Sequence, residues 1–262
     1  MNTNRIKRAA DKAGRISVLK ELYPESAEVL TFLERIVDYQ ASVADKLDQV
    51  AKQICGLQEM HWEDHISVLE ELLGICTAHG TEEIKIRANE LKEIPAAGVR
   101  LLLLEFINGY VPDNTTRFIL LCFMQPLAAS LLAVTDSHDN IQKDRCPVCG
   151  FQPAVSFIRD TTEVAGGRYL RCLLCGTDWA YQRTTCVSCG TNADDSFDYF
   201  FDDKHSCIAI QACRKCSKYT KIVDTRKDGQ AVPELEDIAS ISLDMWAQGR
   251  GLIKVSKNLI GI

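Results

Sequence analysis

Eight of the twelve cysteines in this 262-residue chain form four Cys-x-x-Cys pairs, all in the second half of the sequence. The pairs are Cys146/Cys149, Cys172/Cys175, Cys186/Cys189 and Cys213/Cys216. A Cys-x-x-Cys turn directs two thiolates at one point, and two such turns complete a tetrahedral shell of four sulfur ligands. The sequence therefore predicts two metal ions, iron or zinc, each held by four cysteines.

The spacing of the pairs indicates which of them share an ion. Twenty-two residues separate the first pair from the second, and 23 separate the third from the fourth, whereas only 10 lie between the second and the third. The two long spacers favour a duplicated unit with a period near 40 residues, in which pairs one and two form one site and pairs three and four the other. A site built from pairs two and three stays an alternative, although it would leave the outer pairs without partners.

Each unit repeats one order of elements: a cysteine knuckle, an extended segment, a turn, a return strand and a second knuckle. This order is typical of zinc-ribbon and rubredoxin-like modules. Gly150, Gly176 and Gly190 each follow the second cysteine of a pair, where a left-handed backbone helps to close the knuckle. Ser217 takes this place after the fourth pair, so the second site is expected to be looser.

A metal explains the cysteines better than disulfides or redox dithiols do. A single Cys-x-x-Cys would suit a redox dithiol, but four of them in a repeating layout favour metal binding. A ribbon of this size has almost no core, so metal binding must supply much of its folding free energy, on the order of 10 kcal/mol for structural zinc sites.

The remaining cysteines are expected to play structural roles. Cys55, Cys76 and Cys122 lie on or beside apolar helical stripes and are interpreted as small core hydrophobes. Cys207 is interpreted as a strand residue, with a redox or regulatory role as the alternative. Cys207 and His205 could each replace a missing ligand, but no ligand is missing.

The tract HWEDH places His61 and His65 four residues apart, as in a zinc protease helix. The glutamate that such an enzyme requires after the first histidine is replaced by Trp62. Surface histidines are the better interpretation. No phosphate-binding glycine loop, nucleophile elbow or triad stands out either, so an enzyme is not predicted.

Charge argues against nucleic acid and anionic membranes as the main partners. The net charge is −6, and the cysteine-rich half carries an acidic stretch, Asp194, Asp195, Asp198, Asp202 and Asp203. The longest apolar run, 118–134, has 17 residues and contains Pro126, so a buried helix is expected rather than a membrane span. Residues 1–25 have no secretory apolar core, which predicts a cytoplasmic protein in which disulfides would be unusual.

Apolar residues at helical spacing fill the first half of the chain. Helices are expected over 26–54, 61–76, 82–94, 97–110 and the run that follows the loop 111–114. Ser26 is expected to cap the first of them, and Thr115 or Thr116 the last. The polar tract 136–144 is interpreted as a linker.

The fold class that follows is α+β multidomain: an all-α domain, two tandem metal modules and a C-terminal helix. The predicted boundaries are 1–145 for the helical domain, 146–185 and 186–225 for the rubredoxin-like modules, and 226–262 for the helix and tail. Three uses of the metal modules compete: nucleic-acid binding by a zinc ribbon, electron transfer by an all-thiolate iron centre, and protein docking, for which Tyr199, Phe200 and Phe201 would offer apolar surface.

The motifs resemble those of the formate dehydrogenase accessory protein family, FdhE. The resemblance rests on CPVCGFQPAVS, on GGRYLRCLLCGTDWAYQRTTCVSCG with Trp179 and Arg183, on CRKCSKYTKIVD, and on the later helix EDIASISLDMWA (236–247). FLERIVDYQ (32–40) and MQPLAASLLA (124–133) fit more loosely. The match covers most of 26–247, and the short N-terminus and the tail GLIKVSKNLIGI receive no role from it.

The resemblance implies a cytoplasmic, non-enzymatic maturation factor or chaperone for respiratory formate dehydrogenases. Its partner would be the catalytic subunit, which carries molybdenum or tungsten and selenocysteine or cysteine, before export. Family members are helical on the N-terminal side and bind iron through the Cys-x-x-Cys motifs, all eight cysteines of which are present here. A second copy of the chain is a further possible partner, in a homo-oligomer.

Overall fold

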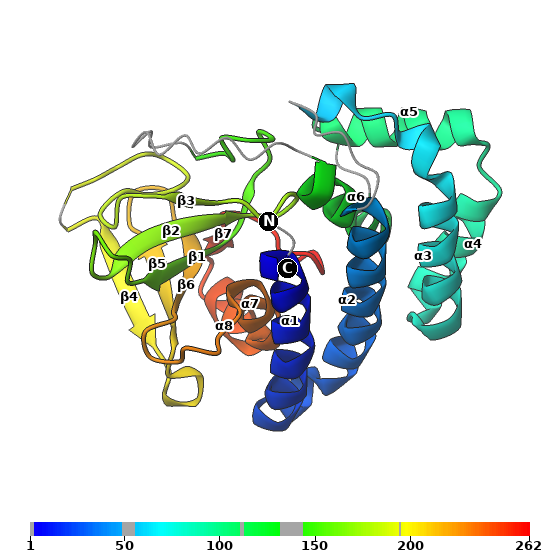
Figure 1. The fold of residues 1–262 in the computed structure, drawn as a ribbon. Coiled ribbons are helices and arrows are strands. Elements are labelled where there is room, and N and C mark those ends of the chain that lie inside the picture. The colour runs from blue at the N-terminus through cyan, green and yellow to red at the C-terminus, as the bar shows by residue number, and fades with distance from the viewer. Residues whose placement is uncertain (1–2, 49–55, 111–112, 132–143, 194) are drawn as a thin grey trace.

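Six helices build the N-terminal part of the computed structural model, which describes residues 3–48, 56–110, 113–131, 144–193 and 195–262 (Figure 1). They are α1 (Thr3–Leu22), α2 (Ala27–Asp48), α3 (Ile66–His79), α4 (Glu82–Lys92), α5 (Ala96–Ile107) and α6 (Asn114–Leu131). Three short 3-10 turns, η1 (Pro24–Ser26), η2 (Leu57–Glu59) and η3 (Trp62–His65), connect them. The predicted helical character of the N-terminal half is confirmed, while Cys55 and most of the predicted linker lie outside the described residues.

Helix α1 is the main element that the sequence pattern does not predict. Its apolar residues are few, but Ile16 and Leu19 are fully buried and Tyr23 follows them into the core. The spacing of three and four residues places all three on one face, which packs against α2. A narrow apolar stripe is therefore enough to hold a helix that is otherwise polar.

Two predicted helix caps are wrong. The Ser26 hydroxyl is buried and donates to the carbonyl oxygen of Ala239 at 2.8 Å instead of capping α2. Asp113 caps α6, because its Oδ1 accepts from the backbone N–H groups of Thr115 and Thr116 at 3.1 and 2.9 Å. Both differences arise because a side chain at a helix end bonds to whichever partner the packing brings closest.

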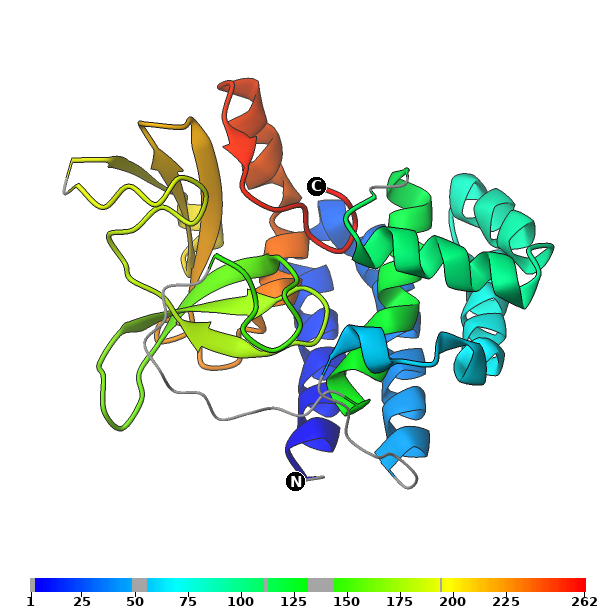
Figure 2. The same cartoon turned by 90° about the horizontal axis from the view of Figure 1, so that it is seen from above.

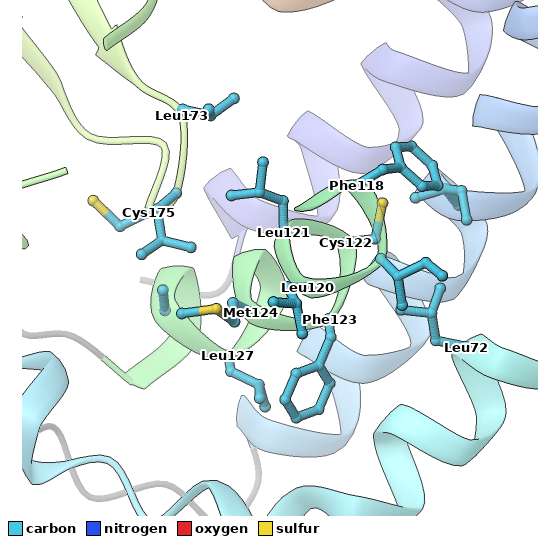
Figure 3. Close-up of a cluster of buried hydrophobic side chains, with 14 of the residues drawn as sticks. Leu72, Phe118, Leu120, Leu121, Cys122, Phe123, Met124, Leu127, Leu173 and Cys175 are labelled. Carbon is cyan, nitrogen blue, oxygen red and sulfur yellow. The ribbon is translucent and has the colours of Figure 1, made fainter. Parts of the chain in front are cut away.

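Helix α6 forms the centre of the helical half. Nearly all of its residues from Thr116 to Leu131 are buried, and it packs against α2, α3 and α4. Cys122 lies fully buried among apolar side chains (Figure 3), and Cys76 of α3 is fully buried as well, which confirms the interpretation of both as core residues. Within the described part of the chain, no helix combines the length and apolar character needed to cross a membrane.

The cysteine-rich region forms one seven-stranded sheet rather than two separate sheets. Its strands are β1 (Pro153–Arg159), β2 (Gly167–Cys172), β3 (Asp178–Ala180), β4 (Phe197–Phe201), β5 (Ile208–Cys213), β6 (Lys218–Asp224) and β7 (Ile253–Lys254). The order is β3-β2-β1-β6-β5-β4, and β7 pairs with β6. Each unit contributes an antiparallel set of three strands, and the parallel pair β1–β6 joins the sets, with Phe157 opposite Val223.

Two helices, not one, follow the last knuckle. Helix α7 (Pro233–Ala239) and helix α8 (Ile241–Gly249) are separated at Ser240. The buried Lys221 ammonium donates to the carbonyl oxygens of Asp237 and Ser240 at 2.5 and 3.3 Å, which satisfies the end of α7 and ends the helix there. These helices and α1 lie between the sheet and the helices α2 to α6 (Figure 2).

Candidate metal centres

The first cysteine group consists of Cys146, Cys149, Cys172 and Cys175, whose sulfur atoms all lie within 4.8 Å of one another. The Sγ atoms of Cys146 and Cys175 are 3.6 Å apart, and those of Cys149 and Cys172 are 3.4 Å apart. The first knuckle precedes β1 and the second follows β2, so the β1–β2 hairpin brings the two together.

The second cysteine group consists of Cys186, Cys189, Cys213 and Cys216, again within 4.8 Å of one another. Its Sγ–Sγ distances are 3.8 Å for Cys186–Cys216 and 3.8 Å for Cys189–Cys213. Cys213 ends β5 and Cys216 precedes β6. The cysteines are thus grouped as the long spacers suggest, and pairs two and three do not form a site.

Both groups have the size of a tetrahedral four-sulfur site. Metal–sulfur bonds of about 2.3 Å give tetrahedron edges of about 3.8 Å. The two Sγ–Sγ distances given above for the second group equal this edge length, and the two for the first group are slightly shorter. The two groups could each hold one metal ion, and an all-thiolate set suits iron and zinc alike.

Local backbone geometry explains why each knuckle closes. In the first, the N–H of Gly150 donates to the carbonyl oxygen of Cys146 at 2.9 Å, and Cys146 N–H donates to Phe151 at 2.8 Å. Gly150, Gly176 and Gly190 have φ angles of +73°, +70° and +69°, which confirms the predicted left-handed backbone. Ser217 adopts the same conformation with φ +56°, so the fourth knuckle keeps the shape at the cost of a strained non-glycine residue.

The thiols of each group differ in how readily they lose a proton. Hydrogen bonds from Cys149, Cys172 and Cys175 lower the pKa of Cys146, whereas burial raises the pKa of Cys172. In the second group, the backbone N–H of Thr191 lowers the pKa of Cys189 to about 7, and burial raises the pKa of Cys186 to about 12. Four thiolates this close repel one another, and a cation at the centre is what would stabilise all of them together.

The surroundings of the two groups are unequal. Three cysteines of the first group, Cys146, Cys172 and Cys175, are buried in the same apolar core as the helices. Gln125 of α6 donates from Nε2 to the carbonyl oxygen of Leu173 at 2.7 Å, and Leu173 and Cys175 lie beside Leu121 and Met124 (Figure 3). In the second group Cys189 is exposed and Cys216 is half-buried.

The other candidate residues lie outside both groups. Cys207 is buried just before β5, and burial raises the pKa of its thiol to about 11. His205 is buried, its ring stacked on Tyr23 with centroids 4.8 Å apart and its Nδ1 2.6 Å from Oδ2 of Asp202. His61 is exposed and His65 half-buried at η3.

The predicted aromatic surface is divided. Tyr199 and Phe201 on β4 are exposed, at 49% and 72% of their full areas. Phe200 points to the other face of the strand and packs edge-on against Trp246 of α8, with ring centroids 4.9 Å apart. Only part of this surface is therefore free for a partner.

A buried charge cluster is the feature that the sequence pattern misses. Lys221 is fully buried, with Nζ 2.5 Å from Oδ2 of Asp244 and 3.1 Å from Oδ1 of Asp237. Lys254 of β7 bonds to both carboxylates, at 3.0 and 3.1 Å. The cluster joins the second module to α7, α8 and the C-terminal tail. In the sequence, Lys221 is one of two lysines in the half-apolar strand KYTKIVD, and its residue type does not predict burial.

Comparison with known proteins identifies relatives of this chain in the FdhE family. Residues 145–183 match the family FdhE, central domain, and residues 184–260 match FdhE, C-terminal domain. A protein from Aquifex aeolicus (strain VF5), described as Protein FdhE homolog, is 40% identical over 277 residues, covering 100% of this chain and 98% of that protein. Another Protein FdhE homolog, from Haemophilus ducreyi, is 27% identical and covers 89% of this chain and 76% of that protein.

The fold also matches a solved structure. The crystal structure of the FdhE protein from Pseudomonas aeruginosa superposes with a TM-score of 0.71 and covers 96% of this chain and 95% of that one. Its sequence identity is 20%, so this match supports the fold alone.

Proposed function

Because this chain belongs to the FdhE family, we propose that it is a cytoplasmic accessory factor that binds the catalytic subunit of a formate dehydrogenase during maturation of that enzyme. It would act by binding, not as an enzyme. The observation that carries the proposal is the match to an FdhE homologue along the whole chain, together with both complete groups of four cysteines.

We further propose that the eight cysteines are metal ligands, one ion to each group. The compact sulfur tetrahedra support this, since four thiols at these distances gain stability from a shared cation. The ion would stabilise each ribbon by linking its two knuckles, because the core of a small ribbon contributes little folding free energy. The four-domain division at 145/146, 185/186 and 225/226 is part of the same proposal, and limited proteolysis would check it.

Capture of the partner tests the function. Tagged, anaerobically purified protein should retain a formate dehydrogenase catalytic subunit, and Cys172→Ser or Cys213→Ser should weaken that retention. Cys207→Ser is the matched control, because this cysteine belongs to the same sheet but to neither group. Unchanged formate dehydrogenase activity in cells that lack the protein would overturn the proposal.

Electron transfer is a second candidate, favoured by the all-sulfur donor sets and by the exposure of Cys189. Iron-loaded protein would then show a reversible change in visible absorption on reduction. Tightly bound zinc without such a change would exclude it.

A further inference from the structure

We propose that the two cysteine groups have different tasks: the first holds a permanent structural ion that fixes the sheet to the helical half, and the second holds an ion that exchanges with solution in the folded protein. This inference rests on the proposed function, in which each group binds one ion. The duplicated sequence gives each site four cysteines, and apart from Ser217 in the fourth knuckle it is their surroundings that distinguish them.

The first cysteine group is part of the contact between the two halves of the molecule. Cys146, Cys172 and Cys175 belong to one continuous cluster of buried residues that also includes the cores of α2, α3 and α6. Leu173 and Leu174, inside the second knuckle, are 5% and 2% exposed. The ring of Phe151, next to the first knuckle, packs on Phe106 of α5 with centroids 5.8 Å apart. Both knuckles of this group therefore have helices packed against them.

Two hydrogen bonds connect α2 and α6 to the second knuckle of this group. Gln40 of α2 donates from Nε2 to Oε1 of Gln125 at 2.8 Å, and Gln125 in turn donates to the carbonyl oxygen of Leu173 at 2.7 Å. This chain runs from α2 through α6 to the backbone between Cys172 and Cys175. The knuckle cannot move away from α6 without leaving these groups unpaired.

The second cysteine group is open to solvent. Cys189 is exposed and Cys216 is half-buried. None of the four cysteines belongs to the buried cluster of the helical half, although Val187, next to Cys186, does. Beside the opening knuckle lies a cleft of about 230 Å³, whose lining includes Tyr181, Thr185, Cys186 and Ser188. A small molecule can therefore approach this group from the cleft and from the exposed side of Cys189.

The route by which an ion leaves depends on whether a chelator can reach its sulfur ligands. A chelator removes a metal by replacing one thiolate at a time, so it must reach a sulfur atom or wait until the protein opens. At the second group Cys189 is an exposed residue, which allows the first replacement in the folded state. At the first group Cys149 is half-buried, and replacing any of the other three thiolates requires the sheet to separate from α6, which is an opening of higher free energy. The strained Ser217 in the fourth knuckle weakens the second group further.

Competition with a chelator tests the inference. Zinc-loaded full-length protein is mixed with an excess of the chromogenic chelator 4-(2-pyridylazo)resorcinol, and zinc release is followed by absorbance and the fold by far-ultraviolet circular dichroism. We expect one ion per chain to leave more than about tenfold faster than the other, without loss of helical signal during the fast phase. Release of both ions at one rate would overturn the inference, whereas a sample that takes up no zinc would instead contradict the proposed function.

A matched pair of variants assigns the phases. Cys149 and Cys189 are each the second cysteine of the opening knuckle in their unit. Cys189→Ser should remove the fast phase and keep the slow one, and Cys149→Ser should remove the slow phase or prevent folding. Loss of the slow phase in Cys189→Ser would overturn the assignment.

Thiol labelling of the unmodified protein gives a check that needs no variant. After brief chelation, iodoacetamide should label cysteines of the second group before those of the first, as read by peptide mass spectrometry. Earlier labelling of Cys146, Cys172 or Cys175 would contradict the inference.

Discussion

Arg15 and Glu236, 221 residues apart in the sequence, form a buried ion pair with Nε and Oε1 2.5 Å apart. Glu236 is fully buried, and its second oxygen, Oε2, has no hydrogen-bond partner among the residues that the structure describes. Arg15 also contacts Asp228 through Nη2 at 2.8 Å. Through this pair, α1 is attached to α7 and thereby to the sheet, so the first and last parts of the chain stabilise each other.

Arg15→Met should lower the free energy of unfolding at neutral pH by about 3–5 kcal/mol, because it leaves a buried carboxylate without its partner. Burial raises the pKa of Glu236, although Arg15 opposes the rise. A carboxyl whose pKa is raised on folding favours the folded state below its ordinary value and loses that effect as the pH rises. The penalty should therefore shrink as the pH falls toward about 4.5, the ordinary glutamate value. Urea unfolding across this pH range measures it.

The control for this prediction is the double variant Arg15→Met/Glu236→Gln, which removes both charges. It should be less destabilised at neutral pH than Arg15→Met alone, because no charge stays buried. Equal losses in the two variants would show that the ion pair is not the source of the effect.

Gln125→Ala should destabilise the protein by about 1–3 kcal/mol, because the buried carbonyl oxygen of Leu173 loses its donor. Since this carbonyl lies within the second knuckle, the slow phase of zinc release should also become faster. Gln40→Ala is the control: it removes the contact between α2 and α6 but leaves the knuckle bonded. A similar acceleration in both variants would count against a specific role of Gln125 at the first group.

Ser217→Gly should stabilise the second module by about 0.5–1 kcal/mol. Glycine removes the conformational free-energy cost of a left-handed serine at φ +56°. This gain is larger than the entropy cost of ordering a glycine on folding. Slower zinc release in the fast phase is the sensitive measurement. Gly190→Ala, at the corresponding place in the third knuckle, should act in the opposite direction, because its Cβ would meet no neighbour and only the backbone would be strained. A destabilised Ser217→Gly variant would refute this account of the knuckle.

Elemental analysis of anaerobically purified protein should find two ions per chain. The double variants Cys146→Ser/Cys175→Ser and Cys186→Ser/Cys216→Ser should each retain one ion, because each removes two ligands from a single group. Retention of two ions, or of none, by both double variants would mean that the groups do not bind metal independently. The same measurement distinguishes iron from zinc.

Elements with local causes could be predicted from the amino-acid sequence. The Cys-x-x-Cys pairs lie on tight turns of fixed reach, and the glycines after them permit the left-handed residue that closes each turn. Apolar residues at helical spacing predicted the run around Phe118 as a buried helix for the same reason, since a period of 3.6 residues is read from neighbouring positions alone. The grouping of the cysteines followed from the spacers, because a β-hairpin joins the two knuckles of each unit.

Features that depend on residues far apart in the chain could not be predicted and are seen in the folded structure alone. Ser26 has the residue type of a helix cap, yet it bonds to Ala239, and Lys221 ends α7 from a strand of the sheet. Helix α1 and the C-terminal tail have weak patterns of their own, and contacts with distant residues fix their positions, including the ion pairs Arg15–Glu236 and Lys254–Asp237. The difference between the two cysteine groups has the same origin. Their local sequences are alike, but helices cover the first and solvent reaches the second, because burial is a property of the packed chain and not of the motif.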